Sequence, residues 1–116
     1  MSDTHTSFKK VVVNSLLDEF GGQSITHDSV LVVKTSTMEN GSILNEDGTE
    51  ATKAEAATAF YIIDAANLDV VNEGKALLVS AVKKDAQVLK SSLKFSDGAY
   101  TNESLTALES KNIQLI

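Results

Sequence analysis

Cysteine is absent from the sequence. Its absence excludes disulfide bonds, thiolate nucleophiles and zinc sites built from thiolates. The stability of the folded chain must therefore come from packing or from assembly with other chains. A reducing interior suits such a composition, but any compartment is compatible with it.

Arginine is absent as well, so every basic residue is a lysine. Sixteen acidic residues oppose ten basic ones, and the formal net charge is -6. Without guanidinium groups the chain has no bidentate fork for phosphate or guanine, and a net negative protein repels a polyanion. We therefore expect no direct contact with nucleic acid.

Long hydrophobic runs are missing too. The longest apolar runs, Val11–Val13 and Val30–Val33, are far shorter than the roughly 20 residues of a transmembrane helix. The first ten residues, MSDTHTSFKK, are polar and precede no apolar signal segment. The sequence predicts a soluble, unprocessed protein without a membrane partner.

Motifs for catalysis, metals and cofactors are also lacking. His5 and His27 do not have the spacing of a metal pair. The loop NEDGTE would place Ile43 and Ala54 at the first and last ligand positions of a calcium loop, where carboxylates are needed. We expect no metal, no cofactor and no catalytic residue, and we predict that the protein is not an enzyme. A hydrolase built from scattered carboxylates stays open as an alternative.

Short apolar segments dominate what is present. The chain has 116 residues, 42% of them hydrophobic, which suits one globular domain. Five or six strands are expected, and they include residues 30–35, 59–64, 76–84 and 87–95. The step Asn40-Gly41 favours a tight turn between the first strand and the next. The Ala-rich second half of the acidic loop 45–57 is expected to form a helical turn.

The C-terminal end predicts a short helix followed by an apolar tail. Thr101 or Asn102 is the expected N-cap, and Glu103 lies in the expected first turn. Asn112 is suited to a left-handed stop after the helix, and this stop brings Ile113 against Leu108. The residues expected to pack in the core or in a trimer interface are Leu105, Leu108, Ile113 and Leu115.

The segment Phe8–Phe20 allows two interpretations. Its apolar residues have helical spacing, and Gly21-Gly22 could end a helix. Three consecutive valines favour an extended chain instead. The segment is therefore either a short helix packed on its own domain or an apolar extended arm.

Taken in order, several segments resemble the lambda-like head decoration proteins of tailed bacteriophages. These segments are HDSVLVVKTSTMENGSIL (27–44), AFYIID (59–64) with the loop NLDVVNEG (67–74), ALLVSAVKKDAQV (76–88), SLKFSDGAYTNES (92–104) and KNIQLI (111–116). NSLLDEFGG (14–22) stands where the family has its N-terminal arm. Phe95 occupies a position where the family has an aromatic residue, often tryptophan, and Asn112 replaces the usual glycine.

This resemblance implies a small, mainly β domain with minor α content (α+β), β-clip-like, over residues 26–116. Residues 1–25 would form an N-terminal arm that is flexible or extended when free. The family resemblance implies a trimer at three-fold and quasi-three-fold positions of an expanded head, where it clamps the major capsid protein. The protein would lie on the outer surface of the virion, and in the host cytoplasm before assembly.

The arm would reach the capsid lattice and add a strand or an apolar plug to it. The expected capsid-binding residues are Val11, Val12, Val13, Leu16, Leu17 and Phe20. The alternative function is another phage or bacterial assembly module, such as a head fibre, neck or tail component.

Overall fold

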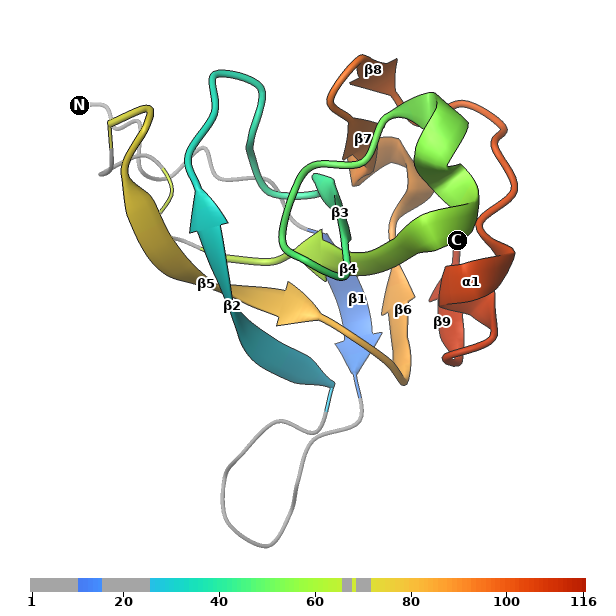
Figure 1. The fold of residues 1–116 in the computed structure, drawn as a ribbon. Coiled ribbons are helices and arrows are strands. Elements are labelled where there is room, and N and C mark those ends of the chain that lie inside the picture. The colour runs from blue at the N-terminus through green and yellow to red at the C-terminus, as the bar shows by residue number, and fades with distance from the viewer. Residues whose placement is uncertain (1–10, 16–25, 66–67, 69–71) are drawn as a thin grey trace, which may run out of the picture.

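The computed structural model of the chain describes residues 11–15, 26–65, 68 and 72–116. They form a mainly β fold with little helix and a short C-terminal helix, as the sequence predicted (Figure 1). In chain order the elements are β1 (Val12–Ser15), β2 (His27–Val33), β3 (Ile43–Asn45), the 3₁₀ helix η2 (Lys53–Thr58), β4 (Ala59–Ile63), β5 (Ala76–Val82), β6 (Ala86–Val88), the 3₁₀ helix η4 (Lys90–Ser92), β7 (Lys94–Phe95), β8 (Gly98–Ala99), α1 (Thr106–Glu109) and β9 (Ile113–Leu115).

These strands form three sheets within the described residues. The largest has the order β2-β5-β4-β3 and is antiparallel throughout. A second sheet has the order β1-β6-β9, in which β6 is antiparallel to β1 and parallel to β9. β7 and β8 form a two-stranded ribbon. Figure 1 shows β2 and β5 on one side of the molecule and α1, β6 and β9 on the other.

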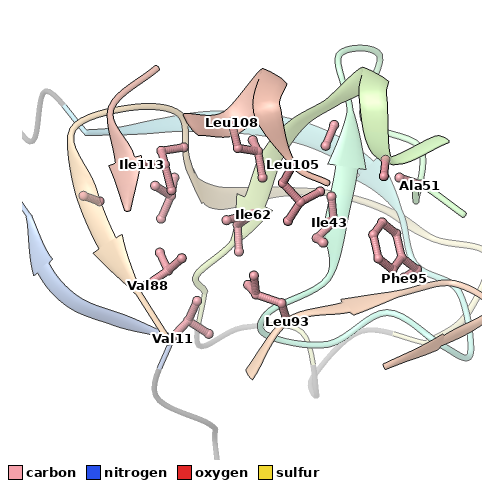
Figure 2. Packing of buried hydrophobic residues seen from close by; sticks show 14 residues of the cluster. Val11, Ile43, Ala51, Ile62, Val88, Leu93, Phe95, Leu105, Leu108 and Ile113 are labelled. Carbon is pink, nitrogen blue, oxygen red and sulfur yellow. The ribbon is translucent and has the colours of Figure 1, made fainter. Parts of the chain in front are cut away.

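Two apolar clusters form the core, and β3 and β4 separate them. Ile43 and Leu44 are adjacent and both fully buried, and so are Ile62 and Ile63. Because successive side chains of a strand point to opposite faces, Ile43 and Ile62 enter one cluster while Leu44 and Ile63 enter the other. Figure 2 shows the first cluster, to which Phe95, Leu105, Leu108 and Ile113 also belong. Strands with apolar residues at every position are typical of such two-sided burial.

The N-terminal segment is extended over the residues that the structure describes. β1 pairs with β6, and the Leu89 N–H donates to the Val11 carbonyl (2.9 Å). Val11 is fully buried in the first cluster (Figure 2). This corrects the predicted boundary at residue 25, because residues 11–15 are part of the folded domain. The rest of the predicted arm, 1–10 and 16–25, lies outside the described residues.

The turn at Asn40-Gly41 forms, but it does not make the predicted hairpin. The Ser42 N–H donates to the Glu39 carbonyl (3.0 Å) and Gly41 has φ 94. β2 and β3 nevertheless lie at opposite edges of their sheet. The turn is tied instead to the end of β4, because the buried Asn40 side chain accepts the Ala65 N–H through Oδ1 (2.7 Å).

The predicted strand 87–95 is also wrong, since it consists of β6, η4 and β7. The Ser92 N–H donates to the Leu89 carbonyl (3.0 Å), and the Leu93 N–H donates to the Lys90 carbonyl (3.1 Å). These bonds close a 3₁₀ turn. The turn lets the chain leave the second sheet and enter the β7–β8 ribbon.

The C-terminal helix is shorter than predicted. It begins at Thr106, and Thr101 and Asn102 do not cap it. Instead their N–H groups donate to the Glu103 carboxylate (3.0 and 3.2 Å), so a separate turn precedes the helix. The stop is as predicted. Asn112 has φ 63 and its N–H donates to the Glu109 carbonyl (3.0 Å).

Candidate functional site

An exposed apolar strip lies on the outer face of β2 and β5. We define it by the residues Leu31, Val33 and Leu78, which are 62%, 56% and 60% exposed. Leu31 lies opposite Leu78, and Val33 lies opposite the exposed Ala76. Scattered apolar residues are normal on a surface, but a contiguous group suggests a contact surface. The apolar strip is therefore the first candidate binding site.

A hollow adjoins the apolar strip, with Leu31, Val33, Met38 and Glu50 in its lining. Its wall includes the turn at Gly48, which packs directly on β2. A Cβ atom at Gly48 would lie 2.6 Å from the Leu31 carbonyl oxygen. The backbone approach is possible only because the residue is glycine.

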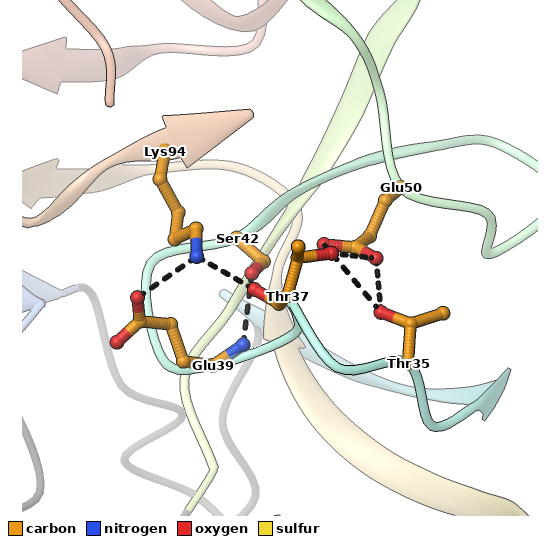
Figure 3. A network of polar contacts seen from close by, with 6 residues as sticks. All are labelled: Thr35, Thr37, Glu39, Ser42, Glu50 and Lys94. Carbon is orange, nitrogen blue, oxygen red and sulfur yellow. Dashed lines mark hydrogen bonds and ion pairs between the residues drawn. The ribbon is translucent and has the colours of Figure 1, made fainter. Parts of the chain in front are cut away.

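A polar network holds the loop beside this hollow (Figure 3). The Glu50 carboxylate accepts hydrogen bonds from the hydroxyls of Thr35 and Thr37, the latter at 2.9 and 3.0 Å. Lys94 donates to the Thr37 carbonyl (2.7 Å) and pairs with Glu39 (3.0 Å). The Glu50 carboxylate, the Thr37 carbonyl and the Lys94 ammonium each bond to another residue of the network. The network therefore positions the loop that follows β2 against β7.

A hydroxyl, an imidazole and a carboxylate lie in a row at the start of β2. Thr26 Oγ1 is 2.7 Å from His27 Nδ1, and His27 Nε2 is 2.8 Å from Asp64 Oδ2. The order of groups is that of a hydrolase triad. However, Thr26 is fully buried, so a substrate cannot reach its hydroxyl. We assign the row a structural role, joining the start of β2 to the end of β4.

A cation lies against an aromatic pair on the other side of the molecule. Lys111 Nζ lies 3.0 Å from the centre of the Phe60 ring and donates to the Phe60 carbonyl (2.9 Å). The ring centres of Phe60 and Tyr61 are 4.7 Å apart in an edge-on arrangement. Burial lowers the pKa of Lys111 and raises the pKa of Tyr61. Lys111 and Phe60 mark the second candidate site.

Among the described residues, no three His, Asp or Glu side chains are placed so that they could hold a metal ion. Within those residues, too, every helix is too short or too polar to cross a bilayer.

The predicted capsid-binding residues differ in burial and in whether the structure describes them. Val11 is fully buried and Val12 is partly buried against the same cluster. This corrects the prediction for Val11, because its side chain fills the domain core and cannot contact a capsid in this structure. Val13 lies in β1. Leu16, Leu17 and Phe20 lie outside the described residues.

The predicted packing residues at the C-terminal end lie together. Leu105, Leu108 and Ile113 are buried in the first cluster, and Leu115 is partly buried against it. They fill the core of a single chain, so no partner is needed to bury them.

Sequence reasoning missed the apolar strip and the contact between Lys111 and Phe60. The run VLVV has apolar residues in both phases of the strand, so it could not show that one face is exposed. Lys111 and Phe60 are 51 residues apart, and no local pattern indicates such a contact.

Comparison of the chain with protein-family models, with curated proteins and with solved structures found no match.

Proposed function

We propose that the protein is a capsid decoration protein. It would bind the outer surface of an expanded phage head and stabilise the head by clamping neighbouring major capsid proteins. The observation that carries this proposal is the ordered series of segments over roughly residues 14–116 that resembles the head decoration family. A trimer at three-fold and quasi-three-fold positions, and a place on the virion surface, are parts of the same proposal.

The apolar strip supports the proposal by offering a docking surface. Leu31, Val33 and Leu78 gather on one sheet face. Burying a large apolar side chain contributes about 1.5 to 3 kcal/mol. Because the three residues are already about 40% covered, burying the rest contributes about 3 to 5 kcal/mol in all. This is less than the roughly 8 kcal/mol of a micromolar affinity, and the entropic cost of association adds to the difference. The strip therefore supplies part of the affinity, and the assembled lattice must add the rest.

The predicted arm keeps a place in this proposal for Val12, Val13, Leu16, Leu17 and Phe20. Val11 is excluded because it is buried in the domain core. A capsid contact through the arm would act together with the apolar strip.

The test is co-sedimentation of purified protein with expanded, undecorated heads. We expect the wild-type protein to bind to saturation at a fixed ratio to the capsid protein. A Leu31→Ser, Leu78→Ser double variant should lose most of this binding, because serine removes the apolar contact. Ile116→Ser is the matched control, since Ile116 is also an exposed apolar residue (51%) but lies outside the strip.

The possible results test the decoration function and the docking surface independently of each other. If wild-type protein does not bind heads to saturation, the decoration function is wrong. Saturable binding to tails or necks instead would favour the alternative assembly module. If the double variant binds heads as well as Ile116→Ser does, the strip is not the docking surface, although the function stands.

A further inference from the structure

A hollow with three lysines lies where two turns meet. We call it the lysine hollow, and its lining includes Lys83, Lys84, Asp85, Lys111 and Phe60. One turn links β5 to β6, and the other follows α1. The Asp85 N–H donates to the Lys111 carbonyl (3.1 Å), and the Asn112 side-chain amide donates to the Asp85 carboxylate (3.0 Å). These bonds join the two turns.

The lysine hollow is positive on a chain that is negative as a whole. It contains three of the ten lysines of a chain with net charge -6, against one lining carboxylate, Asp85. None of the three lysines forms an ion pair with a carboxylate of the described residues. Asp85 itself already accepts the amide of Asn112. Glu46, which lines the neighbouring hollow, compensates the charge of Lys111 in part, because it acts to raise the pKa of that ammonium against the effect of burial. Lys83 and Lys84 form no ion pair within the part of the chain that the structure describes.

Lys111 is held in place for an incoming anion. Its ammonium donates to the Phe60 carbonyl and lies over the Phe60 ring. These two contacts fix the end of the Lys111 side chain, whereas a lysine side chain surrounded by solvent is flexible. Burial lowers its pKa, which means that the charged form is less favourable here than in water. A carboxylate in the hollow would favour the charged form again.

We propose that the lysine hollow binds a short acidic segment of a partner protein. The carboxylates of the segment would contact Lys83, Lys84 and Lys111, and an apolar side chain would pack against Phe60. This binding is independent of the proposed docking through the apolar strip, because it uses other residues.

The charges around the hollow favour a short peptide over a nucleic acid. A second hollow lies on the other side of Lys111 and Phe60, and its lining includes Glu46, Asp47 and Glu55. A long polyanion that entered the lysine hollow would continue onto these carboxylates and be repelled. A segment of a few acidic residues would not extend that far. The lack of arginine also removes the group best suited to phosphate.

The test is a titration of the full-length, isotopically labelled protein with the peptide Ac-EEFEE-NH2, followed by NMR. Saturable shifts are expected at the amides of residues 83–85 and 110–112. The pKa of Lys111 should rise in the complex. Raising the ionic strength from about 0.01 M to about 1 M should abolish binding, because the Debye length falls from about 30 Å to about 3 Å. The uncharged peptide Ac-QQFQQ-NH2 should cause no saturable shift.

Two charge-matched variants locate the site. Lys83→Gln with Lys84→Gln should weaken binding of the acidic peptide by about tenfold, as expected for two surface ion pairs. Lys75→Gln with Lys90→Gln removes the same charge from exposed positions outside the hollow, and it should change the affinity by less than about twofold. Thermal melting checks that both variants fold.

Several results would overturn the proposal. They are the absence of saturable shifts, equal weakening by the two double variants, and tighter binding of the oligonucleotide dT10 than of the peptide at the same amides. Closure of the hollow by a second copy would also overturn it. In that case the same amides would shift on dilution of the free protein, and the peptide would not bind.

Discussion

Substitution of Gly48 and Gly74 separates two consequences of adding a side chain, which are backbone strain and a clash with a neighbouring atom. Both have φ +87, a backbone conformation that side chains disfavour. A Cβ atom at Gly48 would lie 2.6 Å from the Leu31 carbonyl oxygen, whereas a Cβ atom at Gly74 would meet nothing within 4 Å. Gly74 therefore reports backbone strain alone, and Gly48 reports strain together with a clash.

We expect Gly74→Ala to lower the free energy of unfolding by about 1 to 2 kcal/mol, the cost of a left-handed conformation for a residue with a side chain. Gly48→Ala should lower it further, because the clashing atom belongs to the backbone of β2 and cannot rotate away. Urea denaturation of both variants measures the difference. Equal losses would show that the turn at Gly48 moves away from β2 without cost.

Local chemistry made some single residues predictable. Asn112 was expected in the left-handed region and has φ 63. The step Asp47-Gly48 is typical of a turn, and the Gly48 N–H donates to the Asn45 carbonyl (3.0 Å). The contact of Asn40 with Ala65 could not be predicted, since the two residues are 25 apart in sequence and the bond depends on the completed sheet.

At the scale of elements, the existence of strands was predictable but their partners were not. β-Branched runs indicated β2, β4 and β5 because such residues pack well on a pleated surface. Pairing depends on the ends of the chain meeting across the fold. β6, for example, lies between β1 and β9, which come from opposite ends of the chain, and no local signal in 86–88 shows this.

The candidate site was less predictable than the fold. The resemblance led to an expected contact through the arm, yet Val11 is in the core. The apolar strip arises because a run with apolar residues in both phases is covered on one face only. The elements that pack against one face of this run determine that the opposite face stays exposed. Those elements follow later in the chain, so the run itself does not indicate which face it will be.

The place of β1 in the fold leads to a prediction about truncation. A chain that begins at Val11 keeps β1, whereas a chain that begins at Leu16 loses both β1 and the buried Val11. The shorter chain should be less stable than the longer one by at least about 2 kcal/mol, the burial free energy of one large apolar side chain. Its β6 would also lack an antiparallel partner. Urea denaturation of the two truncated proteins measures this difference.

This expectation differs from the one that the predicted division at residue 25 implies, in which the domain folds without residues 1–25. Equal stability of the two truncated proteins would show that β1 adds nothing to the domain. The segment could then act as a free arm after all. A head-binding assay that compares the chain beginning at Val11 with the full-length protein would show whether residues 1–10 contribute to docking.

At the scale of the whole molecule, the two candidate surfaces are separated along β5. Leu78 of the apolar strip and Lys83 of the lysine hollow are five residues apart in sequence, which corresponds to about 17 Å along an extended chain. The strip is apolar and the hollow is positive. Salt should therefore weaken contacts made through the hollow and leave contacts made through the strip unchanged, since screening weakens ion pairs but not apolar burial. A head contact made through the strip should tolerate salt.

Decorated heads should resist heat better than bare heads. A ligand that binds only the expanded lattice stabilises it by mass action, by about 2.7 kcal/mol per site at a free concentration one hundred times the dissociation constant. Calorimetry of bare and saturated heads measures the shift of the melting transition, which should grow with the concentration of free protein. The shift should persist at high salt, and it should be absent with the Leu31→Ser, Leu78→Ser variant at the same concentration. The Ile116→Ser control should stabilise the head as the wild-type protein does. If saturated and bare heads melt together, the protein binds without clamping, and the proposed stabilising role is wrong even where binding is real.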